Sequence, residues 1–454
     1  MLFTRSDFGD DFKWGVSTAA YQTEGAHDKH GKGPSIWDKF TATPGNTFSN
    51  QNANIASNFY NRYTQDITLM SLMNIPNFRF SISWSRIFPN GTGEPNAYGI
   101  DFYNRVIDFC LELDIEPWIT LYHWDLPLEL EKQGGWTNRT IIDWFGEYVY
   151  VCIKRFGDRV KHWMIMNEPM VFVGAGHFLG IHAPGRKGLS NFLAATHHAA
   201  LSQAEGGRIA RSARSDLNLG TTFSASHIEP ATSQNSDLVA AVKVDALLNK
   251  VFIEPLLGMG YPCKDLPLLR RLEPFIKDGD EKRLAFDMDF IGIQNYTREI
   301  VASSYFTPLI QARIVKADER KVERTLMNWE VYPEAIYHVL KKFAAYDNCP
   351  PLIVTENGAA FSDALDNGKI NDSQRCEFLQ NYLVQVLRAK REGVNVNGYF
   401  VWSFTDNFEW AEGYYPRFGL VYVDYKTQQR TIKSSGLWYK DFLEVSSMKE
   451  ALTG

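Results

Sequence analysis

The stretch LIVTENG, residues 352–358, reads as a short apolar strand that ends on a carboxylic acid. Three branched apolar residues and a threonine lead into Glu356, and a glycine interrupts the run two residues later. A second apolar run, VKHWMIMNEP (residues 160–169), ends in the same way on Glu168. In α/β barrels, functional groups project from the C-terminal ends of the strands into a shared pocket. The two glutamates are therefore expected to meet at one end of a barrel.

The rest of the chain alternates strand-like apolar runs with amphipathic helical stretches. The expected strands are residues 12–20, 77–84, 116–123, 162–167, 219–227, 290–297, 352–356 and 398–403. The expected helices are residues 56–73, 100–113, 141–156, 193–211, 238–251, 333–343, 372–391 and 435–442. Most of the strands are continuously apolar, as expected of parallel strands covered on both faces. This pattern predicts a (β/α)8 TIM barrel that forms a single domain over residues 1–454.

Two polar, poorly periodic segments interrupt this alternation, residues 31–54 and residues 299–330. We expect both to be elaborated βα loops that shape the entrance of the barrel. A doubly wound open sheet would alternate in the same way, but no glycine-rich G-x-G-x-x-G turn follows the first expected strand.

Composition excludes several classes of partner. The net charge of −6 is small for 454 residues, so neither nucleic acid nor an anionic membrane is indicated. No apolar run is long enough to cross a bilayer. The five cysteines show no metal-ligand spacing, and the N-terminal MLFTRSDFGDDFKWG lacks the pattern of a signal peptide. Free thiols in a reducing compartment and a cytoplasmic location are therefore expected.

Neither a metal nor a cofactor is expected. The adjacent His197 and His198 lie on an expected helix and point to different faces, and no H-E-x-x-H motif occurs. We interpret both histidines as packing or surface residues.

A pair of carboxyl groups facing one another across a barrel rim can break a glycosidic bond. One acid stays protonated and helps the leaving oxygen depart, while the ionised one attacks the anomeric carbon. The aromatic content of 14%, with 12 tryptophans, fits either a large aromatic core or stacking against sugar rings.

Several motifs carry a resemblance to a known family. In chain order they are FKWGVSTAAYQTEG (12–25), RFSISW (79–84), LYHWDLP (121–127), NEP (167–169), WEVYPE (329–334), LIVTENG (352–358) and VWSFTDNFEWAEGY (401–414). The chain resembles glycoside hydrolase family 1, the retaining β-glucosidases and their relatives, over nearly its whole length. This resemblance implies the same barrel fold and retaining chemistry.

The resemblance assigns catalytic roles by position. Glu356 corresponds to the nucleophile and Glu168 to the acid/base, while Asn167 corresponds to the residue that binds the sugar 2-OH. Arg79 corresponds to the arginine beside the nucleophile, and Tyr296 to the tyrosine that hydrogen-bonds it. We expect a raised pKa for Glu168 and a low pKa for Glu356, because the fixed cation favours the ionised form of the nucleophile.

The same comparison implies a substrate site of hydrogen-bonding groups and indole rings. Amide, imidazole and carboxyl groups match sugar hydroxyls, which donate and accept at once, and the indoles cover the apolar ring face. Trp329 corresponds to a platform nearer the leaving group. The expected substrate-binding residues are Gln22, His123, Trp124, Asn167, Trp329, Trp402, Glu409 and Trp410.

Some positions narrow the prediction. The family branch that cleaves 6-phosphoglycosides has a smaller residue at the position of Glu409, so unphosphorylated sugars are expected. Glu168 argues against the myrosinase branch, in which glutamine replaces the acid/base. The chain departs from the usual pattern at Ile165, Met170 and Asn328, where the family usually has Thr, Trp and Gly. None of these changes removes a catalytic group, but the last two leave the leaving-group preference open.

The predicted function is thus a retaining β-glycosidase, first a β-glucosidase, with β-galactosides and β-fucosides also open. The substrate is a small β-glycoside or an oligosaccharide, and a homo-oligomer is left open. Transglycosylation also stays open, because the same covalent intermediate can pass to an alcohol. A sugar-binding pseudoenzyme predicts the loss of one carboxylate, whereas Glu168 and Glu356 are both present.

Overall fold

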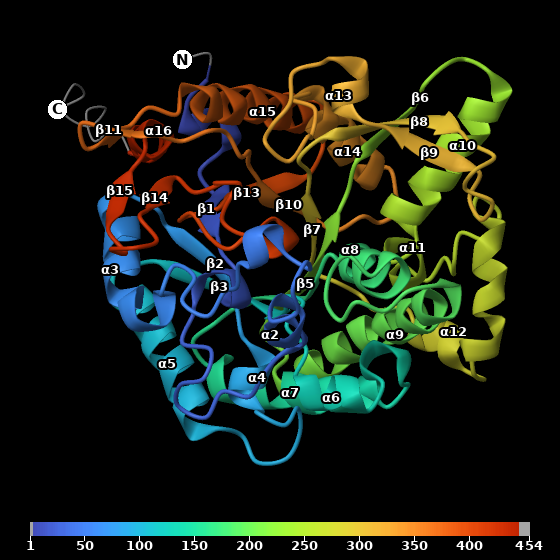
Figure 1. The fold of residues 1–454 in the computed structure, drawn as a ribbon, viewed down its shortest axis with the longest axis horizontal. Coiled ribbons are helices and arrows are strands. Elements are labelled where there is room, and N and C mark those ends of the chain that lie inside the picture. Colours follow the sequence, from blue (N-terminus) through green and yellow to red (C-terminus); the bar gives the residue numbers. More distant parts are fainter. Residues whose placement is uncertain (1–2, 445–454) are drawn as a thin grey trace.

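The centre of the molecule is a closed barrel of parallel strands (Figure 1). The structure, a computed structural model, describes residues 3–444. Around the barrel the strands follow the order β1-β13-β10-β7-β5-β4-β3-β2. Their bounds are β1 Lys13–Ser17, β2 Asn77–Ser81, β3 Glu116–Tyr122, β4 His162–Asn167, β5 Asn218–Ser224, β7 Phe290–Gln294, β10 Leu352–Asn357 and β13 Val396–Trp402. Each expected strand is present, and the predicted (β/α)8 barrel is confirmed.

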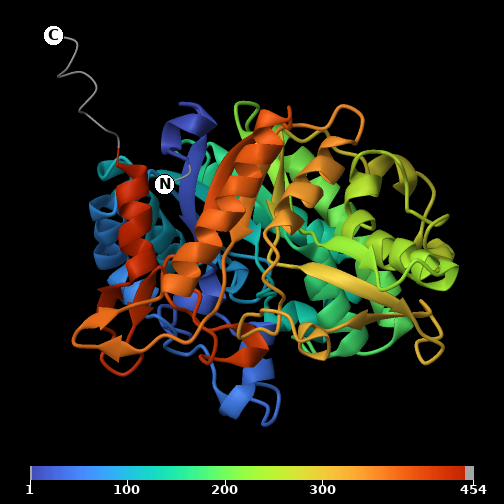
Figure 2. The ribbon, with the colours of Figure 1, turned by 90° about the horizontal axis from the view of Figure 1, so that it is seen from above.

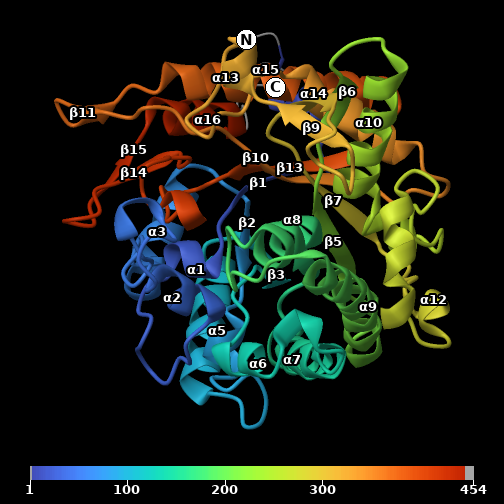
Figure 3. The ribbon, with the colours of Figure 1, turned by 45° about the vertical axis from the view of Figure 1, so that its right-hand side comes forward.

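Helices cover the outside of the barrel, as α3, α5, α7 and α9 do in Figure 3. The principal ones are α3 Phe59–Leu72, α5 Ala97–Glu112, α7 Ile141–Phe156, α9 Leu189–Ala213, α10 Asn235–Asp245, α14 Glu334–Ala344, α15 Ser373–Arg391 and α16 Ser434–Leu443. In α7, Phe145, Val149 and Cys152 recur every three or four residues and are fully buried. This spacing places them on one face, which packs against the barrel.

Short elements fill the connections between the principal ones. The short helices are α1 Ala20–Thr23, α2 Ile36–Thr41, α4 Trp84–Ile87, α6 Leu128–Lys132, α8 Pro169–Val173, α11 Ile253–Leu256, α12 Asp280–Arg283 and α13 Ala317–Arg320. The strands outside the barrel are β6 His227–Pro230, β8 Arg298–Ser303, β9 Ala312–Val315, β11 Leu365–Asp366, β12 Lys369–Ile370, β14 Val421–Val423 and β15 Arg430–Ile432. Residues 31–54, expected as a loop, contain α2, whose N-cap Ser35 forms a reciprocal capping box with Asp38.

Large side chains fill the barrel interior beneath the strand ends. A separate buried cluster is formed by Trp118, Met164, Phe290, Ile353 and Phe400, which come from five different strands. This layer closes the lumen, so a ligand can enter only at the rim where the strands end.

Residues 299–330 lie in the connection from β7 to α14, as expected of an elaborated βα loop, but this connection has regular structure of its own. Strands β8 and β9 form an antiparallel hairpin, and β8 also pairs in parallel with β6, giving a three-stranded sheet beside α10 (Figures 1 and 2). The expected strand 219–227 is also shorter, because β5 ends at Ser224 and β6 begins at His227. These short, polar segments become strands because they pair with segments elsewhere in the chain. The pattern of apolar residues within each segment therefore does not predict a strand.

Within residues 3–444, no helix is both long and apolar enough to span a membrane. The same residues hold no group of three or more His, Cys, Asp or Glu side chains placed to bind a metal ion. His197 and His198 are buried packing residues. His197 contacts Asp280 at 3.0 Å, and His198 contacts the carbonyl oxygen of Trp136 at 3.0 Å.

Candidate active site

A cavity of about 220 Å³ opens at the C-terminal ends of the barrel strands. The predicted site residues that line it are Gln22, His123, Trp124, Glu168, Tyr296, Trp329, Glu356, Trp402, Glu409 and Trp410. Arg79 and Asn167 are fully buried and contact these residues without lining the cavity. The structure therefore brings together side chains that are almost 390 residues apart in the sequence, as between Gln22 and Glu409.

Glu356 lies near the end of β10 and is held at both oxygens. The Arg79 guanidinium, from β2, donates to Oε1 and forms an ion pair there. The Tyr296 hydroxyl donates to Oε2 at 2.6 Å. A charged and a neutral donor thus fix the orientation of this carboxylate from two sides, as expected for a group that must present one oxygen in a defined direction.

The glycine of LIVTENG, Gly358, is needed for steric reasons. A Cβ atom on Gly358 would lie 1.8 Å from the carbonyl oxygen of Trp402. Only glycine therefore allows the end of β10 to approach the end of β13 so closely, which places Glu356 and Trp402 in one cavity.

Asn167 connects three neighbours beneath the cavity. Its Oδ1 accepts from Arg79 Nη2 at 2.6 Å and from Gln294 Nε2 at 2.8 Å, and its Nδ2 contacts His123 Nε2 at 3.1 Å. Burial lowers the pKa of His123 well below its usual value, and Arg79 adds to that effect. The imidazole is thus neutral and accepts the amide hydrogen bond. Gln294 was missed by the sequence analysis, because its contact with Asn167 joins two different strands of the barrel.

Glu168 sits at the junction of β4 and α8 with left-handed backbone geometry, at φ 45°. Its backbone N–H donates to the carbonyl oxygen of Thr222 at 2.9 Å. Trp124 and Trp410 also have positive φ, at 78° and 49°. Residues other than glycine rarely adopt a positive φ. Such backbone strain concentrates at functional sites, where the surrounding structure holds it in place.

The electrostatics of the two glutamates correct one prediction. The pKa of Glu168 is raised well above its usual value, first by burial and then by the negative charge of Glu356. Burial also raises the pKa of Glu356, while the charge of Arg79 and the hydrogen bond from Tyr296 oppose that rise. The expected low pKa of Glu356 is therefore wrong, because complete desolvation of this carboxyl outweighs its cation.

Gln22 in α1 contacts Glu409, so the segments that follow the first and the last barrel strands meet at this point. Gln22 Nε2 donates to Glu409 Oε2 at 3.2 Å and to the Phe408 carbonyl oxygen at 3.0 Å. Gln22 Oε1 and His123 Nδ1 are buried without a hydrogen-bond partner among the described residues. Two polar atoms at the cavity are thus available to a ligand rich in hydroxyl groups.

Aromatic rings form one wall of the cavity. The ring centroids of Trp124 and Trp410 lie 4.6 Å apart, and the ring centroid of Trp37 in α2 lies 4.5 Å from that of Trp410. Tyr21 stacks in parallel with Trp410 at 5.9 Å. The sequence analysis missed the supporting role of Tyr21 and Trp37, since both lie in segments whose contact with Trp410 depends on the closed barrel.

Further lining residues were also missed. They are Val171, His182, Ser224, Met327, Ala411, Glu412 and Phe418. Most belong to the loops that follow the strands, where periodicity carries no signal. Burial lowers the pKa of His182 to about 4, so this residue is neutral near neutral pH.

The sequence profile of Glycosyl hydrolase family 1 matches residues 4–448. The chain belongs to glycosyl hydrolase family 1. Within it, 1,4-beta-D-glucan glucohydrolase of Thermotoga neapolitana is 42% identical over 445 residues, which cover 98% of this chain and 99% of that protein. Beta-glucosidase A of Thermotoga maritima is 41% identical with the same two coverages.

Two solved structures have the same fold as this chain. The family 1 β-glucosidase from Thermotoga maritima matches with a TM-score of 0.92 at 41% identity, covering 96% of this chain and 97% of that chain. The AHE enzyme from Alicyclobacillus herbarius matches with a TM-score of 0.93 at 39% identity, with the same two coverages.

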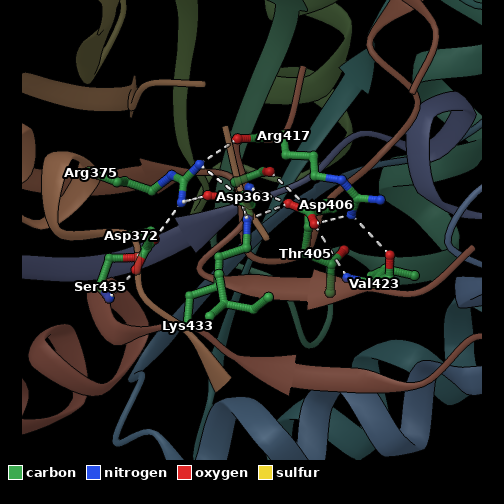
Figure 4. A network of polar contacts seen from close by, with 12 residues as sticks. Asp363, Asp372, Arg375, Thr405, Asp406, Arg417, Val423, Lys433 and Ser435 are labelled. Carbon is green, nitrogen blue, oxygen red and sulfur yellow. Dashed lines mark hydrogen bonds and ion pairs between the residues drawn. The ribbon is translucent and has the colours of Figure 1, made fainter. Parts of the chain in front are cut away.

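A second group of charges in this family 1 chain, which we call the buried ion network, is shown in Figure 4. Its members are Asp363, Asp372, Arg375, Asp406, Arg417 and Lys433. Lys433 Nζ contacts Asp363 at 2.5 Å and Asp406 at 2.6 Å, and no part of the lysine is exposed.

The buried ion network contacts the segments that follow β10 and β13, close in the chain to Glu356 and Glu409. Arg375 donates to the carbonyl oxygen of Ala359, three residues beyond Glu356, at 3.0 Å. Asp406 lies three residues before Glu409 and accepts from the backbone N–H of Gly419 at 3.0 Å. Lys433 pairs with Asp363, which follows β10, and with Asp406, which follows β13, so the network links the two segments beyond these strands.

Proposed function

We propose that this chain is a retaining β-glucosidase that acts on unphosphorylated β-glycosides by double displacement. The observation that carries the proposal is the pair of strand-end carboxyls, Glu168 and Glu356, in one cavity and in different surroundings. Only Glu356 accepts hydrogen bonds from Arg79 and Tyr296, which support its ionised form.

In the first step, the Glu356 carboxylate attacks the anomeric carbon of the bound glycoside. The bond from that carbon to the leaving oxygen breaks, and the proton of Glu168 passes to this oxygen. The leaving group departs as an alcohol, and a covalent glycosyl ester on Glu356 remains. The raised pKa of Glu168 supports this role, because the carboxyl must still hold its proton near neutral pH.

In the second step, the roles of the charges change. Esterification removes the negative charge of Glu356, which is one of the causes that raise the pKa of Glu168. The pKa of Glu168 therefore falls, and its carboxylate takes a proton from the attacking water. The ester bond breaks and the β-anomer is released. An alcohol in place of water gives transglycosylation through the same intermediate.

The polar groups around the cavity supply hydrogen bonds to the terminal sugar. The unpartnered Gln22 Oε1 accepts from one hydroxyl, and His123 Nδ1 and Glu409 are placed for others. Asn167 Nδ2 has two hydrogens, of which one points to His123, so the other is free for the 2-OH. Trp402 and Trp410 cover the apolar face of the ring, and Trp329 serves the leaving group.

The charge of the cavity wall supports a preference for unphosphorylated sugars. No lysine or arginine is among the described residues that line the cavity, whereas Glu168, Glu356, Glu409 and Glu412 are. Burial and the charge of Glu356 raise the pKa of Glu409 to about 8, so only a fraction of the molecules carry a negative charge on Glu409 at neutral pH. The absence of a lining cation is therefore the stronger argument against a phosphate group.

The names of the relatives support β-glucosides as the class of substrate. Two of them, at 42% and 41% identity, are a 1,4-beta-D-glucan glucohydrolase and a beta-glucosidase. Their similarity extends over 98% of this chain.

The deciding experiment is a proton NMR time course on an aryl β-glucoside, with Glu356→Ala run beside the parent protein. We expect the β-sugar to appear first, before mutarotation, and no release by the variant. Appearance of the α-sugar first would contradict double displacement. No release from aryl β-glucoside, β-galactoside or β-fucoside by the parent protein would contradict the enzymatic assignment.

We also propose that the chain acts as a single catalytic domain in the cytoplasm. All five cysteines are free, which fits a reducing compartment. Cell fractionation with thiol labelling tests the location, and a predominantly extracellular signal would contradict it. A homo-oligomer stays a prediction that light scattering can test.

A further inference from the structure

Apolar side chains are exposed on α10 and on the neighbouring hairpin of β8 and β9 (Figures 1 and 3). Tyr305 and Phe306, in the loop that joins the two strands, are 95% and 98% exposed. On α10, Leu238, Val239 and Val242 are between 45% and 47% exposed. We call these five residues the α10 patch. None of them lines the active-site cavity.

The helix α10 is apolar on two faces. Its inner face packs Ala240, Ala241 and Val244 against Val301 of β8 and Ala312 of β9. The three patch residues of α10 have the sequence spacing i, i+1 and i+4 and lie on another face, which nothing in the described part of the chain covers fully. A helix that is apolar on more than one face is normally buried, so the uncovered face indicates a surface that packs against something else.

The hairpin loop is attached to the same stretch of α10. The backbone N–H of Ser303 donates to Asp237 Oδ1 at 2.8 Å, and Lys243 Nζ donates to Gln311 Oε1 at 2.9 Å. Asp237 and Lys243 are the sequence neighbours of the first and last patch residues on the helix. The two ends of the loop are thus fixed beside these residues, and the aromatic and aliphatic parts of the patch lie next to one another.

Hydrogen bonds within the loop give it a defined conformation. The Ser304 N–H donates to the carbonyl oxygen of Gln311 at 3.0 Å, and the Gln311 N–H donates to that of Thr307 at 2.6 Å. The Thr307 hydroxyl donates to the carbonyl oxygen of Ala312 at 2.8 Å. Tyr305 and Phe306 are therefore presented by an ordered turn, which loses less conformational entropy on association than an unstructured loop would.

The charge pattern of the surface favours a second copy of this chain as the partner. Within the described segments 231–242 and 303–312, the only charged residue is Asp237, which is buried. The net charge of −6 makes two copies repel one another in general, but this surface brings no like charges together. Few charges and exposed aromatic rings are typical of interface cores. The two segments also offer no cation to a nucleic acid or an anionic membrane.

The size of the α10 patch is also sufficient. An interface of standard size covers about 800 Å² on each partner, about 65% of it apolar in homodimers, which requires roughly 500 Å² of apolar surface. Two almost fully exposed aromatic side chains supply roughly 300–500 Å² of this area. The half-exposed residues of α10 supply the remainder.

We propose that the α10 patch is a self-complementary interface through which two copies of this chain associate about a twofold axis, with the hairpin loop of each copy against α10 of the other. In such an interface the same patch serves both copies, so one patch is enough and the assembly closes at two chains. The proposal does not depend on the proposed function, because it uses no residue of the active-site cavity.

Sedimentation velocity at several protein concentrations tests the interface. The parent should have the mass of two chains at micromolar concentrations. Phe306→Glu places a charge in each half of the interface and should raise the dissociation constant at least about 30-fold, the effect expected for a central interface residue. Val239→Glu, on the helix, should act in the same direction. Leu72→Glu is the matched control, because Leu72 ends α3 on the opposite side of the molecule and is 63% exposed (Figures 1 and 3).

The variants should differ from the parent only in association. Their kcat/KM on an aryl β-glucoside should stay within about twofold of the parent, because exposed substitutions rarely disturb the fold, which circular dichroism verifies. A parent that stays monomeric throughout the micromolar range overturns the interface. So does a dimer whose dissociation constant changes in neither Phe306→Glu nor Val239→Glu.

A flotation assay with phosphatidylcholine vesicles distinguishes a membrane from a second copy. We expect no flotation of the parent, whereas a monomeric parent that floats with the vesicles would assign the α10 patch to a lipid surface and overturn the proposal. Failure of the parent to hydrolyse an aryl β-glucoside would contradict the proposed function alone, because sedimentation requires no activity.

Discussion

Two buried groups of charges lie within one loop of each other and are built in opposite ways. The catalytic cluster, Glu168, Glu356 and Glu409, has three carboxyls and the single guanidinium of Arg79. The buried ion network has three aspartates and the three cations Arg375, Arg417 and Lys433. The first group has more carboxyl groups than cations, whereas the second has equal numbers of carboxyl groups and cations.

The pKa values follow this difference. Burial raises the pKa of every carboxyl in the catalytic cluster, because one cation cannot offset three desolvated acids. In the network, Lys433 and Arg417 overcome the same desolvation at Asp406 and hold its pKa below the usual value. Desolvation is thus common to both groups, and the number of cations decides whether a carboxyl can hold a proton for chemistry.

The largest effect expected from this comparison is on activity. Glu356→Gln keeps the shape and the acceptor oxygen of the side chain but removes the nucleophile, so kcat on an aryl β-glucoside should fall at least about 10⁴-fold. Steady-state kinetics measures the loss, and circular dichroism verifies the fold. Activity within tenfold of the parent would show that another group attacks the anomeric carbon.

The second prediction concerns the acid/base. Glu168→Gln should lower kcat/KM by about 10²–10⁴-fold on glycosides with poor leaving groups, because their departing oxygen needs a proton. Glycosides of dinitrophenol, whose oxygen leaves without protonation, should lose far less. The alkaline limb of the parent's pH profile reports deprotonation of Glu168 and should be absent from the variant. Full activity on poor leaving groups would refute the assignment.

The third prediction concerns the network. Lys433→Met leaves three buried aspartates with two cations, and removing one partner of a buried pair destabilises by about 3–5 kcal/mol. Denaturant unfolding measures the change in free energy. Lys132→Met is the matched control, because its pair with Glu129 is largely exposed and is worth about 0–1 kcal/mol. Equal effects of the two variants would remove the distinction between the network and an ordinary surface pair.

The smallest effect is a pH dependence of stability. The pKa of Glu409 is about 8 when folded and 4.5 as its usual value, so between these pH values the folded protein binds more protons. Its contribution to stability therefore falls as pH rises through this window. Glu409→Gln removes that dependence, so its melting temperature should gain more on the parent at pH 8 than at pH 5. A difference that does not change with pH would contradict the raised pKa.

Much of the fold could be predicted because short stretches of the sequence carry the patterns of strands and helices. The runs that end on Glu168 and Glu356 are apolar, of strand length and bounded by proline or glycine, and both became barrel strands. The helix 141–156 was expected with the bounds that α7 has. The hairpin of β8 and β9 was missed, because its short polar strands are defined by pairing with β6 and with each other.

By itself, the sequence determined which residues meet at the rim. Parallel strands closed into a barrel must bring their C-terminal ends together, so Glu168 and Glu356 had to share a cavity once the strands were identified. Only the tertiary structure decided how those residues are charged and what surrounds them. The raised pKa of Glu356 and the contact of Gln294 with Asn167 both depend on neighbours far apart in the chain. Desolvation and hydrogen bonding act through space, and no local pattern encodes them.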